Sequence, residues 1–130
     1  MALLINQSPV RITRTASVDL SGSLNRFVVL TTTGQVALPG AAGALAVGVL
    51  DDLGPGGGVS GSNVSLTIFG PAKLEANAAF NQGVPLGVAA TTGRARVGVT
   101  NDYDCALSLE AAGAQGDIVT VFIRANGRVP

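Results

Sequence analysis

Short runs of β-branched and aliphatic residues alternate along the chain with turns rich in glycine, proline and asparagine. Residues 63–69 give the clearest pattern, because Val64, Leu66 and Ile68 alternate with polar residues at the period of a half-buried strand. Residues 118–123 are almost continuously apolar, which predicts a strand with both faces covered. No segment sustains the period of an amphipathic helix. The pattern therefore predicts an all-β fold, a single small β-barrel or β-sandwich with little helix.

Further strands are predicted from shorter runs that are bounded by turn residues. These runs cover residues 26–32, 35–38, 44–50, 84–88, 94–99 and 105–111. The pair Gly70-Pro71 is expected to end the strand at 63–69. Pro85 favours an edge position for its strand, because proline has no N–H to donate to a neighbour. Segment 72–80 is ambiguous between a strand and a single helical turn.

The first 24 residues differ from the rest, because polar and isolated apolar residues are mixed with no sustained period. We interpret residues 1–24 as an extended N-terminal arm and residues 25–130 as the β-barrel or β-sandwich body. The alternative is a first strand over Val10–Thr15. The chain begins without a basic region, so a signal peptide is not predicted. The longest apolar stretch, 36–50, is interrupted by proline and glycine and is shorter than the ~20 residues that span a bilayer, so we expect no membrane partner.

Length and charge narrow the possible functions. The 130 residues suit one domain. Hydrophobic residues make up 47 % and charged residues 12 % of the chain, which excludes a wholly disordered protein. Eight basic residues balance eight acidic ones, and no basic run is present. We therefore expect no direct contact with nucleic acid, which requires a basic surface.

The chemical inventory is poor in catalytic side chains. The chain has no histidine and a single cysteine, Cys105, so a Ser-His-Asp triad, a Cys-His dyad and the common zinc sites are excluded. Cys105 is interpreted as a buried small hydrophobe. We expect no catalytic residue, no cofactor and no metal, and hence a protein that is not an enzyme.

Three kinds of local pattern have simpler interpretations than a functional site. Gly56–Gly61 matches the dinucleotide fingerprint G-x-G-x-x-G, but an alternating strand follows it where the fingerprint requires a helix, so a flexible hairpin loop is predicted. Two groups of carboxylates, Asp51 with Asp52 and Asp102 with Asp104, are interpreted as solvated turn residues. Arg94 and Arg96 are interpreted as part of a solvated outer strand face.

Six segments carry a family likeness, and they are 27–31, 46–50, 71–83, 93–95, 106–112 and 116–123. Through them, residues 26–124 resemble a family of tailed-bacteriophage capsid decoration, or cement, proteins, and the last five segments follow the order of the family's motifs. The resemblance implies a virion structural protein that is made in the bacterial cytoplasm and sits on the outer surface of the expanded head. It also implies a homotrimer that bridges subunits of the phage major capsid protein. The glycine-rich loop at 54–58 and the arm match no motif of the family.

The arm supplies the candidate capsid contacts. Its apolar residues would order on docking and its arginines would pair with capsid carboxylates; these residues are Leu3, Leu4, Ile5, Val10, Arg11, Ile12 and Arg14. Two other functions remain open. A receptor- or carbohydrate-binding β-domain of a phage fibre would use Tyr103, and a carboxylate-only hydrolase or lyase would need two acidic side chains facing each other across a cleft.

Overall fold

The computed structural model describes residues 9–125 and 127–130, and all regular elements in these ranges are β-strands. The prediction of an all-β fold is confirmed. The strands are β1 (Val10–Thr15), β2 (Phe27–Leu30), β3 (Val36–Ala37), β4 (Gly48–Asp52), β5 (Asn63–Glu75), β6 (Pro85–Val88), β7 (Ala95–Val97), β8 (Ala106–Ser108) and β9 (Ile118–Ile123). Segment 72–80 contributes strand up to Glu75 and no helical turn.

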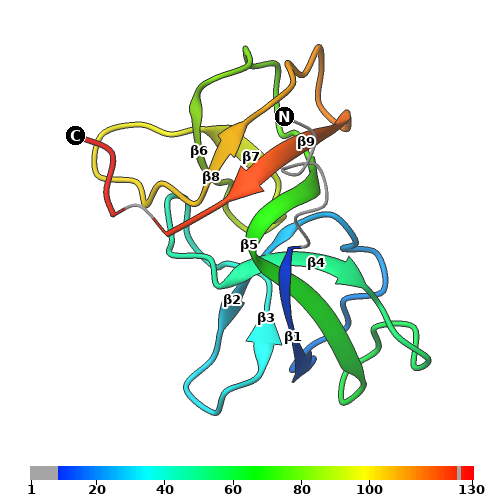
Figure 1. Cartoon of the computed structure of the whole chain (residues 1–130). Helices are drawn as coiled ribbons and strands as arrows, with labels where there is room; N and C mark the ends of the chain where they lie inside the picture. The colour runs from blue at the N-terminus through cyan, green and yellow to red at the C-terminus, as the bar shows by residue number, and fades with distance from the viewer. Residues whose placement is uncertain (1–8, 126) are drawn as a thin grey trace.

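All named strand pairs are antiparallel and form one curled sheet in the order β3-β2-β4-β5-β9-β8-β6-β7, with β1 paired to β5. The long strand β5 runs through both halves of the molecule (Figure 1). Its first part lies between β1 and β4, and its second part pairs with β9. The expectation that Gly70-Pro71 ends this strand is wrong. Gly70 adopts a φ of 104°, so the strand changes direction there and continues.

Two further expectations about strand environment are wrong. β6 is an inner strand, since it pairs with both β7 and β8. Pro85 is tolerated there because it is the first residue of the strand. β9 is covered on one face only: Val119, Val121 and Ile123 are buried, whereas Ile118 on the opposite face is exposed.

The N-terminal segment is part of the body from residue 10 onward. Residues 10–15 form β1 and pair with β5 from Val10 opposite Phe69 to Thr15 opposite Asn63, which is the strand alternative rather than a free arm. Ala16 and Leu20 are fully buried behind this strand. The backbone N–H of Leu20 also donates to the carbonyl of Gly58 at 2.7 Å, which ties the segment to the glycine-rich loop. That loop connects β4 and β5, as the sequence predicts.

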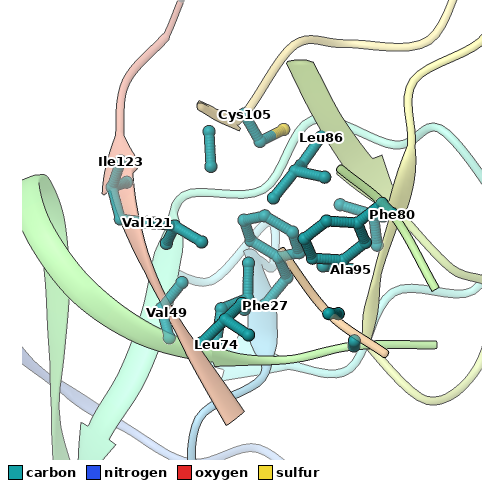
Figure 2. Close-up of a cluster of buried hydrophobic side chains, with 14 residues drawn as sticks. Phe27, Val49, Leu74, Phe80, Leu86, Ala95, Cys105, Val121 and Ile123 are labelled. Carbon is teal, nitrogen blue, oxygen red and sulfur yellow. The ribbon is translucent and has the colours of Figure 1, made fainter. Parts of the chain in front are cut away.

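The core has two clusters. The first cluster lies between β1, β2, β3, β4 and the first part of β5, and its buried members are Ala16, Leu20, Val28, Val36, Leu50, Val64 and Leu66. The second cluster is drawn in Figure 2, and its buried members are Phe27, Val49, Leu74, Ala76, Phe80, Leu86, Val88, Ala95, Cys105, Ala106, Ala112, Val119, Val121 and Ile123. β2 contributes to both clusters, because Phe27 and Val28 point to opposite sides of the strand.

Candidate functional site

The described members of the predicted contact set lie on β1 and do not share one face. Val10, Arg11 and Arg14 are exposed, whereas Ile12 packs against the first cluster. Ile12 therefore contributes to the packing of the fold. Leu3, Leu4 and Ile5 lie outside the described residues. The structure thus brings Val10 and Arg11 together beside the outward face of β5.

Arg11 pairs within the chain. Its Nε lies 2.8 Å from Oδ2 of Asp51, and the Thr67 hydroxyl donates to the same oxygen at 2.7 Å. The other Asp51 oxygen, Oδ1, is buried and accepts no hydrogen bond from the residues that the structure describes. The Arg11 side chain is still 61 % exposed, so its remaining N–H groups face outward.

A pocket of about 430 Å³ opens beside these residues on the outward face of β5. We call it the β5 pocket. Its lining combines apolar and polar side chains, and it consists of Pro9, Arg11, Asn25, Asp51, Thr67, Pro71, Ala72, Lys73 and Thr120. Lys73 donates to the Thr120 hydroxyl at 2.8 Å, and its Nζ lies 4.0 Å from Oε1 of Glu110. The two basic side chains of the lining, Arg11 and Lys73, therefore each lie within ion-pair distance of a carboxylate.

An apolar ridge stands next to this pocket. Strand register places Pro71 of β5, Phe122 of β9 and Leu107 of β8 directly opposite one another, so their side chains share the outward face. Phe69 joins them, with its ring 5.2 Å from that of Phe122 in an edge-to-face arrangement. We call Phe69, Pro71, Leu107 and Phe122 the apolar ridge.

The sequence pattern does not predict the apolar ridge. Phe69 closes the predicted strand at 63–69, at a position where the alternation calls for a polar residue. Phe122 occupies an outward position within an apolar run. The only sequence cue was the scarcity of aromatic residues: of the four phenylalanines, two are placed outside the core.

The second pair of carboxylates is buried, which overturns the prediction of solvated turn residues. Asp102 accepts two hydrogen bonds from Nη2 of Arg96, at 2.8 and 2.7 Å, and one from the backbone N–H of Val99. Asp104 accepts from Nη2 of Arg124 at 2.7 Å. Both carboxylates are about 94 % buried as residues, at 6 % exposure each. They fasten the loops around β7 and β9 to the sheet and do not face each other across a cleft.

Arg94 and Arg96 are also not free on a solvated face. Arg94 donates from Nε to Glu75, which Arg26 contacts from the other side at 3.4 Å. Burial by itself would raise the pKa of Glu75, but the hydrogen bonds from Arg94 and Arg26 and their charges outweigh it and lower the pKa below its ordinary value of 4.5. Glu75 is therefore held as a carboxylate between two guanidinium groups.

The remaining chemical groups offer little reactivity. Burial raises the pKa of the Cys105 thiol, and the charges of Asp104 and Asp102 raise it further, so the thiol stays protonated. The face of Tyr103 is occupied by the Arg128 guanidinium, 4.3 Å from the ring centroid. Within the described ranges, no three His, Cys, Asp or Glu side chains are grouped as metal ligands. The same described ranges contain no helix that is long and apolar enough to cross a bilayer.

The fold resembles a solved phage structure. It is similar to the N base of the head fibre protein gp8.5 of bacteriophage phi29, with a TM-score of 0.65 and 14 % sequence identity. The superposition covers 95 % of this chain and 99 % of that chain. At this identity the likeness establishes the fold alone. No family model and no curated protein matches the sequence.

Proposed function

We propose that the chain is a structural protein of a phage virion that binds the outer surface of the head. It acts as a decoration, or cement, protein: a homotrimer that bridges neighbouring major capsid subunits and stabilises the expanded shell. The observation that carries this proposal is the end-to-end fold likeness to the base of a phage head fibre. The order of the cement-family segments in the sequence supports it.

The distribution of side chains suits such a role. The β5 pocket holds few reactive groups, and five of the eight acidic side chains are in ion pairs, namely Asp51, Glu75, Asp102, Asp104 and Glu110. The outward face instead presents apolar and basic groups from β1, β5 and β9. A trimer that touches several capsid subunits at once gains affinity from repetition, so modest contacts per copy are enough.

A domain of a phage fibre is the second candidate, because the similar structure is itself a fibre base. In its carbohydrate-binding version, Tyr103 would stack on a sugar ring. The Arg128 guanidinium already covers that aromatic face, which disfavours this version.

Cosedimentation with expanded, DNA-free heads tests the proposal. The heads are assembled from the major capsid protein encoded in the same genome as this chain. We expect saturable binding of the folded protein to expanded heads and a higher melting temperature of the decorated shell. A folded protein that leaves every such head undecorated would overturn the proposed function. Glycan binding that disappears in Tyr103→Ala, without head binding, would establish the fibre alternative.

The structure decides which deletion tests the contacts of the N-terminal residues. Deleting residues 1–24 would remove β1 and the buried residues Ala16 and Leu20, so a loss of docking would only report unfolding. The informative variant lacks residues 2–8 and keeps β1 intact. If Leu3, Leu4 and Ile5 contact the capsid, this variant folds normally and binds heads more weakly. Equal binding by the two proteins would remove these residues from the contact set.

A further inference from the structure

The apolar ridge is a continuous strip of apolar side chains on the surface. Leu107, Phe122 and Pro71 stand opposite one another on the adjacent strands β8, β9 and β5 (Figure 1), and the Phe69 ring contacts that of Phe122. Val10 of β1 lies opposite Phe69, and these two residues are 48 % and 51 % exposed. Single exposed apolar residues need no explanation, whereas a contiguous apolar strip indicates a surface that another group covers.

The N-terminal segment, residues 2–8, joins the described structure at one end of this strip. Pro9 precedes Val10 directly and lies against Gly70, with its Cα 3.1 Å from the position that a Cβ on Gly70 would take. Pro9 also lines the β5 pocket together with Pro71, which belongs to the ridge. The N-terminal segment is therefore attached to the body directly beside the apolar ridge.

The N-terminal segment has the composition and the length to cover the ridge. Its sequence, Ala-Leu-Leu-Ile-Asn-Gln-Ser, contains three large aliphatic side chains and no charged one. Residues 3–8 span roughly 20 Å when they are extended. The three strands that carry the ridge lie ~4.8 Å apart, so the distance across them is about 10 Å. Leu3, Leu4 and Ile5 are therefore within reach of every residue of the ridge.

We infer that the N-terminal segment folds back over the apolar ridge of its own chain and covers it, with Leu3, Leu4 and Ile5 as the contacting side chains. The covalent attachment favours this occupant over a separate molecule. A segment joined to the body at Pro9 meets the ridge at an effective concentration in the millimolar range, as short linkers provide, whereas a second molecule meets it only at its concentration in solution.

This contact gives the N-terminal segment a role before the protein meets a head. An uncovered apolar strip promotes association with other apolar surfaces, so the cover protects the free protein from it. The inference concerns the free protein and goes beyond the proposed function. If Leu3, Leu4 and Ile5 also contact the capsid, as the proposed function has it, docking exchanges one contact of the segment for the other and uncovers the ridge at the same time.

Nuclear Overhauser effects in the free, full-length protein test the contact directly. The chain has four phenylalanines and one tyrosine, so the ring signals of Phe69 and Phe122 can be assigned with few variants. We expect cross-peaks from the methyl groups of Leu3, Leu4 or Ile5 to these two rings. A sample that mixes isotope-labelled and unlabelled chains separates contacts within one chain from contacts between copies.

Binding of the apolar dye anilinonaphthalene sulfonate measures the cover in a second way. The triple variant Leu3→Ser, Leu4→Ser, Ile5→Ser keeps the length of the segment and removes its apolar side chains, so we expect an increase in dye fluorescence of about twofold or more. In the Phe69→Ser background the same three changes should give less than about half of that increase, because residues in contact are not additive. Circular dichroism melting verifies that each variant is folded.

Leu45→Ser supplies the matched control background. Leu45 is exposed to nearly the same degree as Phe69, 52 %, and it lines a different pocket, in the connection between β3 and β4. The three changes in the segment should raise the dye fluorescence by the same amount in this background as in the natural protein, because distant sites are additive.

Cross-peaks within one chain, together with the background-dependent increase in fluorescence, support the inference. Cross-peaks found only between labelled and unlabelled chains would assign the segment to the ridge of a neighbouring copy and overturn it. The absence of cross-peaks to both rings, or an equal increase in the natural and Phe69→Ser backgrounds, would also overturn it. Heads take no part in these measurements, so their outcome is separate from that of cosedimentation. A protein that binds no head can still show the cover, and a protein without the cover can still bind heads.

Discussion

The two core clusters are built in different ways although the same strand, β5, runs through both. The first cluster is made of aliphatic residues from β2, β3, β4 and β5 and from the segment that follows β1, and the glycine-rich loop is hydrogen-bonded to that segment. The second cluster holds both buried phenylalanines, Phe27 and Phe80, and ion pairs border it. In the described part of the chain, the ion pairs Arg96–Asp102 and Arg124–Asp104 fasten loops that have few apolar residues to bury. Regular strands are therefore held by apolar burial, whereas irregular segments around β7 to β9 depend on buried charge pairs.

Removing the N-terminal segment should have the largest effect on this arrangement. Without residues 1–24 the first cluster loses Ala16 and Leu20, and β5 loses the partner of its first half. Since one buried leucine contributes about 2–5 kcal/mol and a domain is stable by only about 5–15 kcal/mol, we expect a protein unfolded at 25 °C. Circular dichroism checks this, with the variant lacking residues 2–8 as the control. A cooperative melting transition of the shorter chain would show that the second cluster folds alone.

Replacing single phenylalanines should separate core from surface. Phe27→Ala leaves a cavity in the second cluster and is expected to lower the free energy of unfolding by about 3–5 kcal/mol. Phe69→Ala removes an exposed ring and its edge-to-face contact with Phe122, for an expected loss of about 1 kcal/mol. Denaturant unfolding measures both. Equal losses would mean that Phe69 is as important to the fold as the core, and that the apolar ridge is a structural element.

Neutralising a buried carboxylate should cost more than neutralising an exposed one. Asp102→Asn removes the charge that Arg96 faces, and we expect a loss of about 1–3 kcal/mol, since solvent reaches part of Arg96. Glu110→Gln changes the exposed pair with Lys73, which solvent screens, and should lower the melting temperature less than Asp102→Asn does. Thermal melts of the two variants under identical conditions make the comparison. If Asp102→Asn has the same melting temperature as the natural protein, the ion pair with Arg96 does not hold the loop.

The pH dependence of stability should reveal the ion pairs of Glu75 with Arg26 and Arg94. The pKa of Glu75 is lower in the folded chain than its ordinary value of 4.5. Its contribution to the free energy of unfolding is therefore complete above the ordinary value and is lost as pH falls through the folded pKa. We expect the natural protein to lose stability in this acidic range. Glu75→Gln should be less stable at pH 7 and should lose less on acidification. Parallel pH profiles for the two proteins would refute the assignment.

The periodic segments were predictable because their side chains carry the information locally. The alternation at 63–69 and the apolar run at 118–123 both became strands at the predicted places. The errors arose where a long-range partner decided the outcome. Asp102 and Arg96 are six residues apart and Asp104 and Arg124 are twenty apart, and nothing in the local pattern shows that a buried ion pair joins them. Likewise, β1 became a strand because β5 offered it an edge, although residues 10–15 have a weak pattern of their own.

The sequence by itself determined that the protein is all-β, because turn residues and short β-branched runs restrict the backbone locally. It also determined the lack of histidine, and it predicted the burial of the single cysteine, which the structure confirms. Only the tertiary structure decided which side of each strand faces outward, because a side chain's exposure depends on the strands paired beside it. That is why the apolar ridge and the β5 pocket appear only after β5, β9, β8 and β1 are placed in register.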